Sequence, residues 1–328
     1  MKVLVTGGAG YIGSVVCGEL LRAGHQVVVL DNLSHGHREA VPKQAELVVA
    51  ELADRAKLDA LLQGGRFDAV MHFAALIEAG ESMKAPEQFF RNNTATTLIL
   101  LEAMLAAGVQ RFVFSSTAAL FGNPDRTPIE EDDPVHPTNA YGESKLLVER
   151  MLAWFHQIHG LRYASLRYFN AAGAASVECG EAHQPETHLI PRILNVALGK
   201  AEHATIFGTD YPTADGTCVR DYIHVSDLAS AHLLALHGLE NAEKLIYNLG
   251  NGQGFSVRQM IAVARKVTGR NIPVVEAPRR DGDPAVLIAS SAKIRRELGW
   301  LPKFVDLESI VESAWQWHLR NPEGFARV

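Results

Sequence analysis

A tyrosine and a lysine one helical turn apart are the residues of this chain best suited to chemistry. Tyr141 and Lys145 lie in the run AYGESKLLVERMLAWFHQIHG, so on a helix their side chains share one face. A free phenol ionises near a pKa of about 10, which is too high for a base at neutral pH, but a nearby cation favours the phenolate. The spacing therefore predicts a phenol that exchanges a proton with a substrate, assisted by an ammonium group.

A glycine pattern at the N-terminus predicts the partner of that base. Three glycines lie between an apolar, strand-like segment and the start of a helix-like one: Gly7, Gly10 and Gly13. This order of strand, turn and helix start binds the pyrophosphate of a dinucleotide. The next apolar segment, residues 26–30, ends in Asp31, whose carboxylate can accept hydrogen bonds from the adenosine ribose and repels a 2′-phosphate. Because the nearest following arginine is Arg38, the sequence predicts NAD rather than NADP as the cofactor.

Composition limits the remaining function classes. The chain has 328 residues, 47% of them hydrophobic, and a net charge of −6, which suits one compact α/β unit with an appended lobe or two interleaved domains. We expect neither nucleic acid nor a membrane as a partner, because the charge is mildly acidic and no apolar run has the length of a membrane span. The three cysteines form no C-x-x-C pair, so we expect reduced thiols in the cytoplasm. The fourteen histidines show no familiar ligand spacing, and the sequence therefore predicts no metal site.

Strand-like and helix-like segments alternate through the first half of the chain. The expected strands cover residues 3–5, 26–30, 47–50, 68–73, 111–115 and 163–167, and the expected helices cover 12–21, 89–107 and 141–159. This alternation predicts an α/β fold with a Rossmann-type doubly wound parallel sheet and a smaller C-terminal α/β substrate-binding lobe. We expect an NAD-binding domain at residues 1–171, to which a segment near 219–240 returns, and a nucleotide-sugar-binding domain at 172–328.

Six motifs in a fixed order resemble one enzyme superfamily. TGGAGYIG, HFAA, FSSTAALFG, YGESK, RYFNAAG and VRDYIHVSDLA resemble the extended short-chain dehydrogenase/reductases, and with THLIP and RRDGDPA the whole chain resembles their UDP-glucose 4-epimerase family. The resemblance implies a tightly held NAD and the interconversion of UDP-galactose and UDP-glucose. In that reaction hydride leaves C4 of the hexose, a 4-keto sugar turns over in the site, and hydride returns to the opposite face.

The resemblance also implies roles for individual residues. Tyr141 would be the general base and acid, Lys145 its electrostatic partner and a ligand of the nicotinamide ribose, and Thr117 the hydroxyl that hydrogen-bonds the sugar 4-oxygen. The implied cofactor-binding set is Gly7, Gly10, Tyr11, Ile12, Gly13, Asp31, Asn32, Glu51, Leu52, Phe73, Ala74, Ala75, Asn92, Tyr141, Lys145 and Phe169. The implied substrate-binding set is Thr117, Asn170, His188, Leu189, Thr205, Ile206, Phe207, Arg220, Arg280, Asp283 and Leu287. Within it the arginines suit a diphosphate, because guanidinium groups bind phosphates bidentately. Leu287 matches a position that gates the space around the sugar C2 substituent.

Some alternatives stay open and others are disfavoured. Epimerases of other UDP-sugars (UDP-GlcNAc, UDP-GalNAc, UDP-glucuronate, UDP-arabinose) share the motifs, whereas a non-catalytic NAD-binding regulator usually lacks the tyrosine–lysine pair. Sugar dehydratases and decarboxylases place acidic residues directly after the hydroxyl residue, where this chain has Ala118 and Ala119. Two further departures affect cofactor contacts: Phe121 replaces a common Tyr, and Ile77 a Lys found in some members. Family members commonly pair the helices at 89–107 and 141–159 with those of a second copy, so we expect a homodimer.

Overall fold

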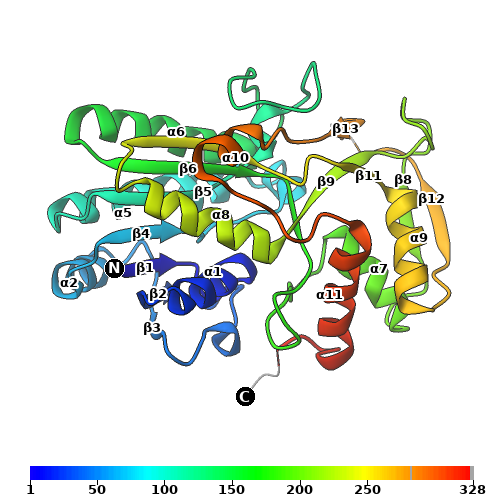
Figure 1. The fold of residues 1–328 in the computed structure, drawn as a ribbon, viewed down its shortest axis with the longest axis horizontal. Helices are drawn as coiled ribbons and strands as arrows, with labels where there is room; N and C mark the ends of the chain where they lie inside the picture. Colours follow the sequence, from blue (N-terminus) through cyan, green and yellow to red (C-terminus); the bar gives the residue numbers. More distant parts are fainter. Residues whose placement is uncertain (281–282, 326–328) are drawn as a thin grey trace.

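The computed structural model describes residues 1–280 and 283–325, which form a larger and a smaller lobe (Figure 1). The RRDGDPA motif includes Asp281 and Gly282, which lie outside the described residues. The larger lobe is built on a parallel sheet of seven strands: β1 (Lys2–Thr6), β2 (Gln26–Asp31), β3 (Glu46–Val49), β4 (Ala69–His72), β5 (Arg111–Thr117), β6 (Arg162–Tyr168) and β10 (Lys244–Leu249). The Rossmann-type parallel sheet predicted from the sequence is therefore confirmed.

Helices cover both faces of this sheet because its strands are apolar on both sides. Along β1, Val3 and Val5 enter one core cluster while Leu4 enters another, as the period of two in a strand requires. The first cluster packs under α1 (Tyr11–Arg22) and α8 (Val225–Gly238). The second packs under three helices: α2 (Arg55–Gly65), α5 (Thr96–Ala106) and α6 (Ala140–His159).

The order of the strands places a ligand site at one edge of the sheet. The order is β10-β6-β5-β4-β1-β2-β3, so the chain runs outward from β1 in one direction and then returns to continue from β4 in the other. In such sheets ligands bind in the crevice beyond the carboxyl ends of the strands at this switch point. The glycine turn follows β1, and Thr117 ends β5, so both predicted parts of the site lie at that edge.

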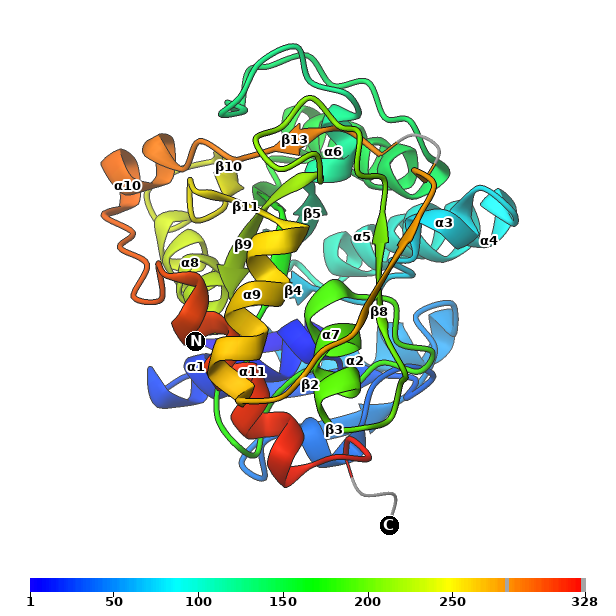
Figure 2. The same cartoon turned by 90° about the vertical axis from the view of Figure 1, so that its right-hand side faces the viewer.

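The smaller lobe has its own core between short strands and helices (Figure 2). Its strands are β7 (Asn170–Ala172), β8 (Ala204–Phe207), β9 (Val219–His224), β11 (Gly254–Ser256), β12 (Val274–Ala277) and β13 (Val286–Leu287). Its helices are α7 (Leu189–Ala197), α9 (Val257–Thr268) and α11 (Leu307–Arg320), and α9 contacts both of the others. The remaining short elements are η1 (Arg38–Ala40), α3 (Ala79–Ser82), α4 (Pro86–Phe89), η3 (Ala118–Phe121) and α10 (Ala292–Leu298).

Three details differ from the sequence-based expectation. The single helix expected at 89–107 is three consecutive pieces, because the π-helical turn η2 (Phe90–Ala95) separates α4 from α5. Helix α2 was not among the expected elements. The chain that follows β9 contributes α8, which packs on α1, and also β10, which pairs with β6 beyond the expected range of 219–240. Within the described ranges, no helix combines the length and the apolar character needed to cross a bilayer.

Candidate active site

A cavity of about 560 Å³ lies between the lobes, at the carboxyl ends of the parallel strands. One side of its wall comes from the glycine turn and the strand ends of the larger lobe. The other side comes from α7, β8 and β9 of the smaller lobe. The cavity is therefore bounded by both lobes at the edge of the sheet where the predicted site residues lie.

The glycine turn brings backbone, not side chains, to the cavity. Gly7 has a φ of +73°, and a Cβ there would lie 2.4 Å from the Ala74 nitrogen. A Cβ on Gly13 would lie 2.2 Å from the Gly7 carbonyl oxygen. Both positions therefore exclude any larger residue, and they hold the N-terminus of α1 close to the end of β4. The free N–H groups of a helix start in such a cradle favour a phosphate group.

Asp31 lies at the end of β2 on the cavity wall, as expected, and also stabilises the turn. Its Oδ2 accepts a hydrogen bond from the Ala9 backbone N–H at 3.0 Å, and its Oδ1 accepts one from Leu33 N–H at 2.9 Å. Next to it, Asn32 donates from its side-chain amide to the Glu51 carboxylate at 3.1 Å. A carboxylate can accept further hydrogen bonds beyond these, so Asp31 retains capacity for a ribose hydroxyl.

Nearly all of the predicted cofactor positions line the cavity. The lining residues from that set are Gly7, Gly10, Tyr11, Ile12, Gly13, Asp31, Asn32, Glu51, Leu52, Phe73, Ala74, Ala75, Asn92, Tyr141 and Phe169. Lys145 is the exception, because its side chain is buried behind the wall. Ile77 lines the cavity, while Phe121 is fully buried under the Arg167 guanidinium, whose centre lies 5.4 Å from the ring.

Tyr141 and Thr117 meet at the centre of the cavity. Asn139 caps α6 by accepting a hydrogen bond from Gly142 N–H at 2.8 Å, which starts the helix just before Tyr141. The phenol is hydrogen-bonded to Thr117, which ends β5. Burial nevertheless raises the pKa of Tyr141 to about 12, because it opposes ionisation more strongly than the Thr117 hydrogen bond favours it. The phenol therefore needs an added positive charge to act as a base at neutral pH.

Lys145 shares the helix face of Tyr141, but its ammonium group is held by the sheet. Its Nζ donates to the Ser115 carbonyl oxygen at 3.0 Å and lies 4.9 Å from the centre of the Phe114 ring. Burial lowers the pKa of Lys145 to about 7. The i,i+4 spacing is thus confirmed as one shared face, whereas no direct hydrogen bond between the two side chains is present among the described contacts.

A buried ion pair fixes the next turn of the same helix. Glu149 follows Lys145 by four residues, and its carboxylate accepts from Ser116 Oγ at 2.6 Å and from Arg167 Nη2 at 2.7 Å. Both side chains of the ion pair are less than a tenth exposed. Ser116 precedes Thr117 on β5, and Arg167 precedes Tyr168 on β6, so this cluster ties α6 to the strand ends that form the site. The sequence analysis did not identify Glu149 or Arg167, because the two residues lie in separate segments and nothing in either segment indicates the pairing.

Other residues at the site also escaped the sequence analysis. Tyr168 lines the cavity and pairs with Ser115, with 2.5 Å between the Tyr168 hydroxyl oxygen and Ser115 Oγ. Glu78 lines it as well and lies near enough to Tyr141 to raise the pKa of that phenol further, after burial. Asn93, in the π-helical turn, donates to the Leu76 carbonyl and accepts from the Leu76 N–H, both at 2.9 Å. Tyr168 could have been predicted at the site because it is the last residue of β6, and the strand ends line the cavity.

The substrate half of the cavity carries two arginines from different segments. Arg220, on β9, donates to the Pro284 carbonyl at 2.8 Å and lies 3.5 Å from the Asp283 carboxylate. The Arg280 guanidinium lies over the Phe207 ring, 4.0 Å from its centre. Asn170 donates to the Asp221 carbonyl at 2.8 Å. The cavity lining includes Thr117, Asn170, His188, Leu189, Thr205, Phe207, Arg220, Arg280 and Asp283 from the predicted substrate set.

Two predicted substrate residues do not line this cavity. Ile206 points into the core of the smaller lobe, because side chains alternate along β8 and its neighbours face the opening. Leu287 is partly buried in β13, where it packs against the cluster that contains Leu120 and Phe121. Leu287 could therefore limit the space around the sugar only by displacing the residues packed against it, or if a larger side chain at this position reached the cavity.

The segment between β7 and α7 adds charged groups to the same wall. Glu181, His183 and His188 line the cavity, and Glu186 lies beside them. Burial disfavours the imidazolium of His188, but hydrogen bonds to Glu181 and Glu186 outweigh it and raise the pKa of His188 to about 10. Apart from His188, these residues were absent from the predicted site.

Comparison with known proteins places this geometry in a family. Residues 3–250 match the model of the NAD dependent epimerase/dehydratase family. A UDP-glucose 4-epimerase from Corynebacterium glutamicum is 52% identical over 96% of this chain and 95% of its own length. Another from Halalkalibacterium halodurans is 51% identical, over 99% and 98%. The solved structure of UDP-glucose 4-epimerase from Bifidobacterium longum, in complex with NAD⁺ and UDP, is 36% identical and has a TM-score of 0.95, covering 99% of this chain and 100% of that one.

Proposed function

The chain belongs to the NAD dependent epimerase/dehydratase family, and we propose that it is the NAD-dependent enzyme that interconverts UDP-galactose and UDP-glucose. One observation carries the proposal. The hydrogen-bonded pair of Thr117 and Tyr141 lies in a single cavity between a dinucleotide-type glycine turn and a wall that bears Arg220 and Arg280. A proton acceptor thus lies where a cofactor and a nucleotide sugar would meet.

The cofactor half of the cavity fits NAD. A Cβ on Gly7 or Gly13 would collide with neighbouring backbone, so the turn stays tight, and its backbone lines the cavity at the N-terminus of α1, where a pyrophosphate is favoured. The Asp31 carboxylate ends β2 on the cavity wall, where it would accept from the ribose hydroxyls and repel the extra phosphate of NADP. NAD would supply the acceptor that takes hydride from the sugar C4 and returns it to the opposite face, through a 4-keto sugar.

The protein residues would manage one proton and the orientation of the sugar. Tyr141 would remove the O4 proton as C4 is oxidised and return it when C4 is reduced. Thr117 would hydrogen-bond the same oxygen and hold it against the phenol. The positive charge of an oxidised nicotinamide, together with Lys145 behind the wall, would lower the pKa of Tyr141 from the high value that burial imposes.

One feature favours epimerisation over dehydration or decarboxylation. The residues after Thr117 are Ala118 and Ala119, neither of which can donate or accept a proton from its side chain, so the extra acid and base needed for dehydration are missing at that place. A redox-neutral isomerisation needs no added nucleotide. We therefore propose that NAD remains bound through turnover.

We also propose a homodimer, a cytoplasmic location and the two-domain division given above, with α8 and β10 as the elements that return to the NAD-binding domain. Leu98 on α5 is 37% exposed, and Trp154 and Ile158 on α6 are 61% and 65% exposed, so an apolar surface extends over the helices expected to pair. Leu101, by contrast, is buried within the monomer. The three cysteines are all free, as expected in a reducing compartment.

The decisive experiment uses purified protein without added NAD. UDP-galactose, UDP-glucose, UDP-GalNAc and UDP-glucuronate are incubated separately, and the products are identified chromatographically. We expect mutual conversion of the first two and a transient rise in the reduced-nicotinamide absorbance. Conversion of none of the four, or of UDP-glucuronate alone, would reject the proposed activity.

A further inference from the structure

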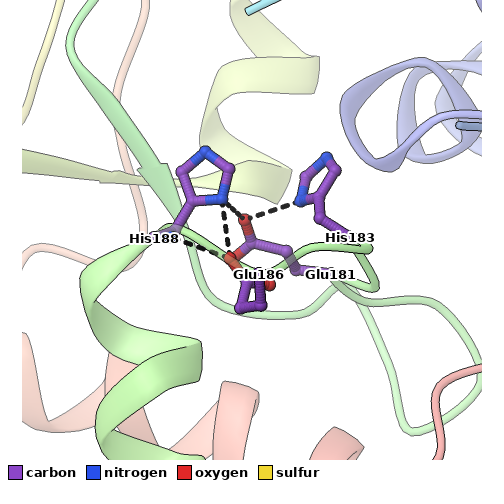
Figure 3. Close-up of side chains that lie close together, drawn as sticks. All are labelled: Glu181, His183, Glu186 and His188. Atoms are coloured by element: carbon purple, nitrogen blue, oxygen red, sulfur yellow. Dashed lines mark hydrogen bonds and ion pairs between the residues drawn. The ribbon is translucent and has the colours of Figure 1, made fainter. Parts of the chain in front are cut away.

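Four side chains on the segment between β7 and α7 converge on one point beside the cavity. They follow the spacing E-x-H-x-x-E-x-H, from Glu181 to His188. Figure 3 shows that both imidazole rings turn Nδ1 inward toward the carboxylates and Nε2 outward. One donor atom from each of the four residues lies within 4.8 Å of all the others. We propose that Glu181, His183, Glu186 and His188 bind a divalent transition-metal ion of the zinc class.

The separations between the donor atoms support this assignment. Oε1 of Glu181 lies 3.2 Å from His183 Nδ1 and 3.0 Å from His188 Nδ1, and Oε1 of Glu186 lies 2.9 Å from His188 Nδ1. Bonds of about 2.0–2.2 Å from a tetrahedral zinc ion separate its ligands by roughly 3.3 Å. Three of the separations are therefore already close to those of a metal site, and the others are no longer than 4.8 Å.

The chemistry of the donors selects the class of ion. Two imidazole nitrogens and two carboxylate oxygens suit zinc and related transition metals, whereas calcium and magnesium prefer oxygen alone. The two carboxylates would place two negative charges at one point, and a divalent ion neutralises both. The side chains of His188 and His183 are 39% and 19% exposed, so an ion can enter from the cavity.

The surrounding contacts hold the segment in place. The Glu181 side chain is only 6% exposed, and its backbone carbonyl accepts from the Trp317 indole N–H at 3.0 Å. The neighbouring Ala182 carbonyl lies 2.8 Å from His37 Nε2, on the larger lobe. Because His188 leads into α7, the ion would join the cofactor half of the cavity to the substrate half.

The test measures metal binding and does not depend on catalysis. The full chain with its bound cofactor is treated with EDTA, freed of chelator, and titrated with Zn²⁺ against a chromophoric competitor. Retained metal is counted after gel filtration. We expect one zinc per chain for the natural protein, and binding at least about 10-fold weaker for His183→Ala and for Glu186→Gln.

A matched control uses another close pair of histidines. His25 and His237 have their Nε2 atoms 3.1 Å apart but lie away from the cluster, so His237→Ala should bind zinc like the natural protein. Co²⁺ adds a second readout, because tetrahedral nitrogen and oxygen ligation gives intense visible bands that His183→Ala should lose. Circular dichroism establishes that each variant is folded. The proposal is overturned if the natural protein retains no zinc, if folded cluster variants bind as well as it does, or if His237→Ala abolishes binding.

Discussion

Replacing Tyr141 by Phe removes one oxygen atom from the centre of the cavity and keeps the ring. The ring packs edge-on against Phe89, with 6.5 Å between ring centres, and this contact survives the change. The variant loses the hydrogen bond to Thr117, a net loss of about 1 kcal/mol in the free energy of unfolding. We therefore expect a folded protein that still binds its cofactor.

The expected loss of activity is far larger than the loss of stability. With a pKa of about 12, ionising this phenol at pH 7 in the unliganded cavity costs about 7 kcal/mol, since each unit is about 1.4 kcal/mol. The protein must therefore recruit positive charge to use Tyr141 at all, and phenylalanine cannot exchange the proton. General acid–base groups contribute roughly 10²–10⁴-fold, or about 3–5 kcal/mol, so kcat should fall by at least a hundredfold with KM nearly unchanged.

The assay follows UDP-galactose conversion to UDP-glucose at several pH values. Tyr163→Phe is the matched control, because Tyr163 is a buried phenol on β6 that does not line the cavity. In the natural protein, activity should fall as the pH falls through the pKa of Tyr141 with cofactor bound, since the phenolate is the reactive form. Turnover of Tyr141→Phe within a few-fold of the natural enzyme would refute the assignment of the base.

Three further changes test other parts of the site, and a fourth tests His72, which is buried in the larger sheet. Glu149→Gln should lower kcat at least tenfold with little change in KM or in bound NAD, because the ion pair positions the reacting helix; an unchanged kcat would make its role purely structural. Asp31→Ala should weaken the binding of NAD and reduce the preference for NAD over NADP, as measured by titration with each cofactor. An unchanged preference would show that Asp31 does not contact the ribose. Because leucine is smaller than tyrosine at the position that Leu287 matches, we expect weak activity on N-acetylated UDP-sugars. Leu287→Tyr should abolish that activity and spare UDP-galactose, whereas equal loss on both would indicate overpacking. Burial lowers the pKa of His72 to about 3, so between that pH and about 6.5 this residue takes up a proton only when the protein unfolds. The free energy of unfolding should therefore fall by up to about 1.4 kcal/mol for each pH unit below 6.5. Urea unfolding at several pH values should show a weaker dependence of this free energy on pH for His72→Gln than for the natural protein.

Local pattern was sufficient for six of the seven strands in the larger sheet and for the glycine turn. The first strand is apolar on both faces, and its glycines must pass close to backbone, so the chain itself carries both signals. The break in the helix expected at 89–107 had no such signal. Asn93 enters a π-helical turn while its amide bonds to Leu76 and Ser144, two partners distant in sequence. Tertiary contacts thus decided a feature that helical periodicity alone could not indicate.

The same limit explains why the sequence did not indicate which protein groups contact Lys145. The spacing fixes which helix face carries the ammonium group, but the register of β5 decides what it meets. Side chains alternate along that strand, so Phe114 and Ser116 face α6 while the Ser115 carbonyl is left to accept from Lys145. We therefore expect Tyr141 to depend for its charge on the bound cofactor more than on its helix neighbour. It follows that a variant without the Lys145 charge should shift the acid limb of the pH profile upward yet retain proton transfer, whereas loss of Tyr141 removes the transfer itself.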